Sequence, residues 1–244
     1  MKTGNCAVSV ASGVEREKSM EIKLAPSILS ADFAALGEDV RHVTPEADLL
    51  HVDVMDGHFV PNLTVGPAVV ASLSKCTDLP LDCHLMIESP SDYYEQFAEA
   101  GASWITFHRE ATDDPGAEIE AIRSLGVRVG MSISPDTPFE EAKPWIRSLD
   151  LFLVMSVYPG FAGQRFIEAV LPKIESARQL VNESGVDVDI EVDGGIGEET
   201  AASAVAAGAN VLVAGSAIFG ASSPLEAARR IRNAVSELLG TDND

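Results

Sequence analysis

The sequence predicts a single (β/α)8 barrel, an α/β fold in which eight parallel strands alternate with helices. Short apolar runs rich in β-branched residues recur eight times along the 244 residues, as expected for buried strands. Segments with helical start and stop signals separate these runs, and such alternation builds parallel βαβ units. Eight units fit a chain of about 250 residues, the usual length of one barrel.

The predicted strands are short and spread along the whole chain. A doubly wound open sheet is the alternative arrangement, but the first strand–helix turn has no G-x-G-x-x-G fingerprint. We therefore expect a barrel with strands that begin near Ile22, Asp48, Leu79, Trp104, Val127, Leu151, Val188 and Asn210.

One of the intervening helices has clear ends in residues 89–102, SPSDYYEQFAEAGA. Ser89 is a possible N-cap and Pro90 fits the first turn, where its missing N–H costs nothing. Gly101 is a stop signal, and the next strand follows it directly.

A second well-marked helix occupies residues 223–240. Ser223 and Glu226 have the spacing of a capping box, and Gly240 ends the segment. Apolar residues recur at helical spacing between them, at Leu225, Ala228, Ile231, Val235 and Leu238.

The chain divides into an N-terminal extension and one catalytic domain. Residues 1–20 lack the long apolar region of a signal peptide, and we expect them to be a poorly ordered extension, with Met20 a possible alternative start. Residues 21–240 contain no linker or low-complexity segment, so they are expected to form the barrel.

Composition excludes several classes of function. The net charge is −21, from 38 acidic and 17 basic residues, which argues against binding nucleic acid. No window approaches the roughly 18 apolar residues of a membrane span. Three cysteines, Cys6, Cys76 and Cys83, give no even disulfide framework, which favours a cytoplasmic location. The acidic surface suits either a high-salt habitat or an ordinary acidic protein.

The strand at residues 49–55, LLHVDVM, places polar groups on one face. Side chains alternate along a strand, so His51, Asp53 and Met55 point the same way. Burying two chargeable groups is costly unless they have partners. We therefore expect this face to serve a functional site at the carboxyl end of the strand.

Two further strands end with the same kind of residue. In LDCHLM, His84 and Met86 share one face, while Cys83 is predicted to point outward into the core. In IEVDGG, Glu191 and Asp193 share a face just before two glycines. The same layer of the barrel therefore receives polar groups from three strands.

Two histidines and two aspartates suit a divalent metal such as Zn²⁺, with Fe²⁺ or Mn²⁺ also possible. The candidate ligands are His51, Asp53, His84 and Asp193. Each alone could be a structural polar residue, but their common layer favours a metal site. Three methionines near it are either gap-filling core or a polarizable floor that excludes water: Met55, Met86 and Met155.

The remaining histidines have weaker patterns. His42 is expected on the solvated face of a helix, and His58 in a loop. His108 ends the fourth strand, where it is a candidate for supporting the metal ligands.

Glycine-rich loops follow the last three predicted strands. They read YPGFAGQRF at 158–166, DGGIG at 193–197 and AGSAIF at 214–219. Phosphate-binding barrels use the loops after strands seven and eight, and glycine lets backbone N–H groups approach the anion. The pattern therefore predicts a barrel of the phosphate-binding type, with a small ligand that joins a metal-binding end to a phosphate.

Six motifs, read together, resemble the ribulose-phosphate 3-epimerase family. They span roughly residues 24–219 and are LAPSILSADFAALG, HVDVMDGHFVPN, LDCHLMI, VMSVYPGFAGQRF, EVDGGI and AGSAIF. The resemblance implies an enzyme of the pentose phosphate pathway that interconverts D-ribulose 5-phosphate and D-xylulose 5-phosphate. It also implies a homo-oligomer, a dimer or a hexamer.

The resemblance also assigns roles to residues. It implies one divalent metal ion per subunit, Zn²⁺ first and Fe²⁺, Mn²⁺ or Co²⁺ as alternatives, held by the four candidate ligands. Asp53 and Asp193 would be the acid–base pair that epimerises C3 through an enediolate, while the metal acts as a Lewis acid. The implied substrate contacts are Ser27, His84, Gly160, Phe161, Ala162, Gly163, Asp193, Gly194, Gly195, Gly215 and Ser216.

Two residues depart from the family pattern. Ala162 replaces a glycine of the G-F-G-G-Q loop, and Tyr158 stands where a smaller polar residue is usual. These positions leave open a D-allulose 6-phosphate 3-epimerase as the alternative. A hexulose-phosphate synthase and a non-catalytic sugar-phosphate-binding barrel are further alternatives, although two opposed aspartates favour epimerisation.

Overall fold

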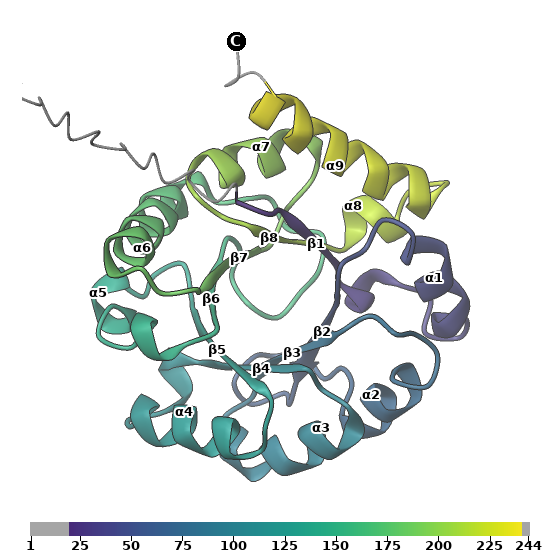
Figure 1. The fold of residues 1–244 in the computed structure, drawn as a ribbon. Helices are drawn as coiled ribbons and strands as arrows, with labels where there is room; N and C mark the ends of the chain where they lie inside the picture. The colour runs from purple at the N-terminus through teal and green to yellow at the C-terminus, as the bar shows by residue number, and fades with distance from the viewer. Residues whose placement is uncertain (1–19, 241–244) are drawn as a thin grey trace, which may run out of the picture.

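A computed structural model describes residues 20–240 of the chain. Eight strands form a ring with helices around its outside (Figure 1). The strands are β1 Lys23–Pro26, β2 Leu50–Met55, β3 Leu81–Met86, β4 Trp104–His108, β5 Arg128–Ile133, β6 Leu151–Met155, β7 Asp189–Asp193 and β8 Val211–Ala214.

Nine α-helices lie in the described part of the chain, together with five short 3-10 turns. The helices are α1 Leu36–Val43, α2 Pro67–Leu73, α3 Tyr94–Ala100, α4 Pro115–Ser124, α5 Phe139–Ala142, α6 Leu171–Ser184, α7 Glu198–Ala206, α8 Ser216–Phe219 and α9 Pro224–Gly240. The turns are η1 Ile28–Ser30, η2 Pro90–Asp92, η3 Arg109–Ala111, η4 Ile146–Ser148 and η5 Glu168–Val170.

The sheet is parallel throughout and curls into a barrel. Its order is β1-β8-β7-β6-β5-β4-β3-β2. A parallel bridge between Ser27 and His51 connects β1 with β2 at the remaining seam, and the Asp48 N–H donates to the Leu24 carbonyl there at 2.9 Å. The predicted (β/α)8 barrel is confirmed, and each strand begins within two residues of its expected start.

The helix ends agree only in part with the sequence patterns. Gly101 ends α3 in the left-handed conformation, at φ 103°, as predicted. The predicted helix start was wrong, because Pro90 opens the separate turn η2 and Ser89 makes no side-chain cap. Tyr93, at φ −126° and ψ −6°, separates that turn from α3.

The last helix begins with half of the predicted capping box. The Glu226 N–H donates to Ser223 Oγ at 3.4 Å. The Glu226 carboxylate instead pairs with Arg229 at 2.8 Å, one turn further along α9. Gly240 is the last described residue of α9.

The strands are covered on both faces. Their outward side chains pack against the helices in one large apolar cluster that includes Cys83, which therefore points outward as predicted. His42 lies exposed on α1 and His58 exposed in a loop, also as predicted. Among residues 20–240, no helix combines the length and the apolar character that crossing a bilayer requires. The extension predicted for residues 1–20 falls outside the described residues except for Met20.

Candidate active site

The inner face of the barrel brings the four candidate metal ligands together near the carboxyl ends of β2, β3 and β7. One ligand atom from each of His51, Asp53, His84 and Asp193 lies within 4.8 Å of the others. Asp53 Oδ1 lies 3.4 Å from His51 Nε2 and 3.6 Å from His84 Nδ1. Asp193 Oδ2 lies 4.0 Å and 3.9 Å from the same nitrogens.

These four atoms fit a metal ion. His51 Nε2 and His84 Nδ1 are both buried and have no hydrogen-bond partner within the described chain, so each can direct a lone pair into the cluster. Metal bonds of about 2.0–2.2 Å place neighbouring tetrahedral ligands roughly 3.3 Å apart. The observed histidine–aspartate separations of 3.4 to 4.0 Å are close to this spacing.

A buried carboxylate orients His51. Asp82 Oδ2 lies 2.6 Å from His51 Nδ1, an arrangement that leaves Nε2 free to bind a metal. Glu191 Oε1 lies 3.5 Å from the same Nδ1. The sequence analysis missed Asp82, although its spacing of two residues from His84 placed it on the same inner face.

A third histidine supports His84. The Nε2 atoms of His84 and His108 are 2.8 Å apart, and the two rings lie end to end, with centroids 4.9 Å apart and an interplanar angle of 21°. His108 Nδ1 contacts Glu110 Oε2 at 3.1 Å. His108 therefore lies beside the candidate ligands as predicted, whereas Glu110 was not anticipated.

The pKa values of His51 and His84 are shifted in opposite directions. Burial would lower the pKa of His51, but the charges of Asp53 and Asp82 raise it well above its usual value. Burial lowers the pKa of His84 to about 4, and the neighbouring His108 and His51 contribute to that decrease. A metal ion would therefore compete with a proton at His51, and not at His84.

The carboxyl groups also differ. Burial opposes ionisation of Asp53, but His51 and His84 lower its pKa well below the usual range. Burial, and next the charge of Asp53, raise the pKa of Asp193 to about 7. Burial and the neighbouring Asp82 raise the pKa of Glu191 well above its usual value. Two carboxyl groups with opposed pKa shifts are a common sign of acid–base chemistry.

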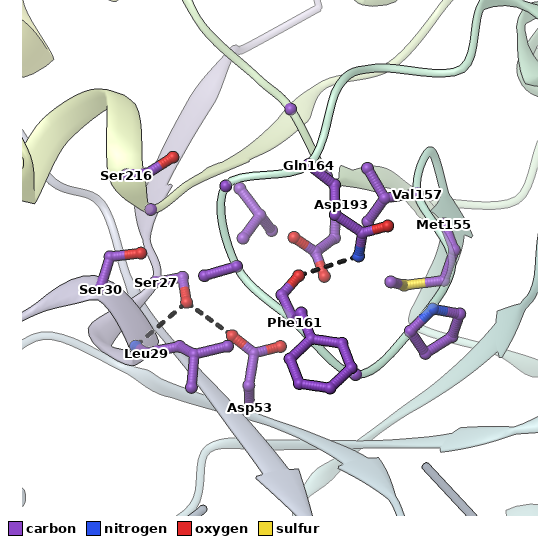
Figure 2. Close-up of a pocket in the computed structure, with 18 of the residues that line it drawn as sticks. Ser27, Leu29, Ser30, Asp53, Met155, Val157, Phe161, Gln164, Asp193 and Ser216 are labelled. Atoms are coloured by element: carbon purple, nitrogen blue, oxygen red, sulfur yellow. Dashed lines mark hydrogen bonds between the residues drawn. The ribbon is translucent and has the colours of Figure 1, made fainter. Parts of the chain in front are cut away.

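A pocket opens directly above this cluster (Figure 2). Asp53 and Asp193 line it, whereas His51 and His84 lie deeper and do not. Ser27 Oγ donates to Asp53 Oδ2 at 2.5 Å and accepts from the Leu29 N–H at 3.3 Å, so one aspartate oxygen is held in place. The other predicted residues that line the pocket are Met55, Met86, Met155, Gly160, Phe161, Ala162, Gly163, Gly194, Gly195, Gly215 and Ser216.

Glycines at the end of β7 allow two loops to meet beside the pocket. A Cβ on Gly194 would lie 2.5 Å from a Val157 methyl group, and a Cβ on Gly195 would lie 2.4 Å from the Phe166 nitrogen. Both glycines also have positive φ, at 122° and 65°, which other residues rarely adopt. The backbone of this loop can therefore reach the pocket where a larger residue would displace its neighbour.

The loop after β6 lines part of the pocket, and hydrogen bonds within the loop fix its conformation. Gln164 Nε2 donates to the carbonyls of Tyr158 at 2.7 Å and Phe161 at 2.9 Å. Gln164 also lines the pocket, a position that the sequence analysis did not assign. The Tyr158 hydroxyl lies 3.0 Å from Asp136 Oδ1 and its side chain does not line the pocket, so of the two unusual residues only Ala162 faces it.

The fold and this site define a class of protein. It is a (β/α)8 barrel with a buried histidine–aspartate cluster that opens into a glycine-lined pocket, as in barrel enzymes that handle small phosphorylated compounds. Residues 23–219 match the Ribulose-phosphate 3 epimerase family. The chain belongs to that family, and the resemblance predicted from the sequence is confirmed.

Characterised relatives agree with this assignment. A ribulose-phosphate 3-epimerase of Bacillus subtilis is 50% identical over 213 residues, which cover 86% of this chain and 98% of that relative. The cytoplasmic isoform of Oryza sativa is 49% identical over 218 residues, covering 87% and 94%. A solved 3-hexulose-6-phosphate synthase has a TM-score of 0.68 at 21% identity, covering 88% of this chain and 100% of that chain, a likeness of fold alone.

Proposed function

We propose that this protein interconverts D-ribulose 5-phosphate and D-xylulose 5-phosphate by epimerisation at C3. The main observation in support is that Asp53 on β2 and Asp193 on β7 line one pocket above a buried histidine pair. The family assignment supports the same reaction, because its members at about half identity carry that name.

The two aspartates are suited to move protons on opposite faces of one carbon. Epimerisation removes the C3 proton and its electron pair stays in the substrate as an enediolate. One carboxylate accepts that proton, and the carboxylic acid of the other aspartate then donates its own proton to the opposite face of C3. The product leaves with inverted configuration, and the aspartates have exchanged their protonation states.

We propose that His51, Asp53, His84 and Asp193 hold one divalent ion per subunit, with Zn²⁺ first and Fe²⁺, Mn²⁺ or Co²⁺ as alternatives. When bound, such an ion supplies Lewis-acid stabilisation of negative charge at the substrate oxygens. The unpartnered nitrogens of His51 and His84 support this assignment. Asp82 would keep His51 in the tautomer that binds metal.

The phosphate end of the substrate is assigned to the glycine-rich loops. Residues of the loops after β6, β7 and β8 line the pocket, among them Gly163, Gly195 and Gly215, and glycine permits backbone N–H groups to approach an anion closely. Met55, Met86 and Met155 would form the apolar floor that keeps water from the reacting carbon.

The proposal extends to the state of the protein in the cell. We assign it to the cytoplasm and expect a homo-oligomer, a dimer or a hexamer, as the family resemblance implies. D-Allulose 6-phosphate remains the second candidate substrate, because Ala162 faces the pocket.

A coupled assay with both sugar phosphates tests the substrate. We expect kcat/KM for D-ribulose 5-phosphate to exceed that for D-allulose 6-phosphate, and the reverse order would reassign the enzyme. In deuterium oxide, product formed in the first turnovers should carry deuterium at C3. Substantial direct transfer of a C3 label from substrate to product would indicate one base and contradict the two-aspartate scheme.

His84→Ala tests the metal assignment. The variant should keep the barrel's circular dichroism but lose bound metal, measured by elemental analysis of protein purified without added metal, and most of its turnover. His58→Ala, in an exposed loop, is the matched control. Full metal occupancy in His84→Ala would show that the ligand set is wrong.

A further inference from the structure

A line of contacts runs from the candidate metal ligands outward to η3, the turn after β4. It starts at His84 on β3, passes through His108 at the end of β4, and ends at Glu110 in η3. Both histidines are completely buried. None of the proposed chemical steps uses His108 or Glu110.

The far end of this line is a fixed hydrogen-bond acceptor. Glu110 Oε1 accepts from the Ser134 N–H at 2.7 Å and from the Thr137 hydroxyl. These donors, together with His108, outweigh burial and lower the pKa of Glu110 to about 2. Lys173 Nζ binds the carbonyl oxygens of Ser134, Pro135 and Thr137 at 3.2, 2.6 and 2.7 Å, so the loop that supplies these donors is itself anchored.

A fixed acceptor at one end determines the proton positions along the line. An ionised Glu110 can only accept, so His108 Nδ1 must carry a hydrogen. With that hydrogen on Nδ1, the His108 ring can accept at Nε2, and a hydrogen on His84 Nε2 fits this acceptor at 2.8 Å. His84 Nδ1 is left with a free lone pair, 3.6 Å from Asp53 Oδ1 and 3.9 Å from Asp193 Oδ2.

We propose that His108 and Glu110 are positioning residues that hold His84 in the tautomer and orientation required for metal binding. This inference rests on the proposed function, because it assigns a purpose to contacts of one proposed ligand. It gives His84 the kind of support that Asp82 gives His51, through an imidazole and a carboxylate in series. Outer contacts of this kind are commonly worth roughly 10–100-fold in metal affinity.

Two substitutions at His108 separate positioning from packing. In His108→Gln the amide oxygen can accept from His84 while the amide nitrogen donates to Glu110, so we expect Zn²⁺ affinity within a fewfold of wild type. In His108→Leu the hydrogen of His84 Nε2 loses its acceptor, and affinity should fall roughly 10–100-fold. Phe107→Leu, a buried neighbour on the outer face of β4, is the control that perturbs packing without touching the line.

The measurements are Zn²⁺ affinity by competition with a chromophoric chelator and the visible absorption of the Co²⁺-loaded protein. We expect the Co²⁺ spectrum to change in His108→Leu and to match wild type in His108→Gln and Phe107→Leu. Equal affinity in His108→Leu and wild type would overturn the proposal, and so would equal losses in His108→Leu and Phe107→Leu. If wild-type protein itself bound no metal, the proposed metal site would fail first, which is a different result.

Glu110→Ala keeps the test open if His108→Leu does not fold. Its loss of Zn²⁺ affinity should be smaller than that of His108→Leu. The hydrogen bond between His84 and His108 remains in Glu110→Ala, but either histidine can then be its donor. In the double variant His108→Leu/Glu110→Ala the losses should not add, since both residues act through His84. Fully additive losses would contradict a line of connected contacts.

Discussion

The two faces of β2, β3 and β4 are equally buried but differ in chemistry. The outward face presents only apolar side chains to the helices: Val52, Val54, Cys83, Leu85, Ile105 and Phe107. The inward face adds polar and ionisable groups to the apolar Met55, Met86 and Trp104: His51, Asp53, Asp82, His84, Thr106 and His108. Buried side chains on the outward face therefore serve packing, whereas buried polar side chains on the inward face belong to the proposed site.

The buried charges of the inward face should lower the free energy of unfolding. Buried charges cost desolvation free energy that their mutual attraction repays only in part, and functional sites commonly lower stability in this way. The outward face supplies the compensating apolar contacts. Substitutions on the two faces should therefore have opposite consequences for stability and activity. Three experiments test this contrast, and a fourth compares both faces with the molecular surface.

Asp53→Asn should have the largest effect. It keeps the size of the side chain but removes a proton acceptor and a proposed metal ligand, so we expect kcat to fall about 10³-fold or more. The measurement is the coupled epimerase assay, with circular dichroism as the check on folding. A decrease of less than tenfold would remove Asp53 from the acid–base pair.

Phe107→Ala tests the outward face. Removing a completely buried ring should lower the free energy of unfolding by about 3–5 kcal/mol, measured by urea denaturation. The folded fraction should keep wild-type metal affinity, because Phe107 points away from the cluster. A selective loss of metal binding, without loss of stability, would mean that the two faces are not independent.

Asp193→Asn should stabilise the metal-free protein at high pH. The pKa of Asp193 is raised to about 7 in the folded state, so its stabilising contribution is present below pH 4 and is lost as pH rises to 7. The amide that replaces the carboxyl group does not ionise, and at pH 8 the variant should be more stable than wild type by on the order of 2 kcal/mol. Denaturation at pH 5 and pH 8 checks this, and an equal difference at both pH values would contradict it.

Salt should have the smallest effect, because it acts on the charges of the molecular surface. With a net charge of −21, self-repulsion should weaken in 1 M KCl, where the Debye length is about 3 Å. We expect the melting temperature to rise by about 2–4 °C, equivalent to roughly 1 kcal/mol. A melting temperature that stayed constant or fell would favour an ordinary acidic surface over a high-salt adaptation.

Strand periodicity predicted much of the barrel and its charged layer. Alternation in LHVDVM placed His51 and Asp53 on one face, and the structure brings them together with Asp193. The same alternation places Asp82 on the inner face of β3, but its role depends on a contact with His51 of the neighbouring strand, which the pattern within one strand does not describe. Local periodicity carries this information since neighbouring parallel strands keep their register.

Contacts between distant loops could not be predicted from local pattern. Glu110 follows β4, but its partners Ser134 and Thr137 follow β5, and nothing in either segment specifies that they meet. Whether Tyr158 alters the pocket was left open by the sequence, and its hydroxyl contacts Asp136 outside the pocket lining. Side-chain direction in a loop depends on its tertiary neighbours, which periodicity does not describe.

The seam between β1 and β2 has a consequence for a chain that is still being synthesised. β1 hydrogen-bonds along its length to β8, whereas it meets the β2 side through the Ser27–His51 bridge and the contacts of Leu24 with Asp48, so the barrel cannot close before the last strand has been made. His51, Asp53 and His84 leave the ribosome long before Asp193, and a nascent chain offers an incomplete set of ligands. We therefore expect the proposed four-ligand site to bind metal tightly only after β7, which carries Asp193, has been synthesised.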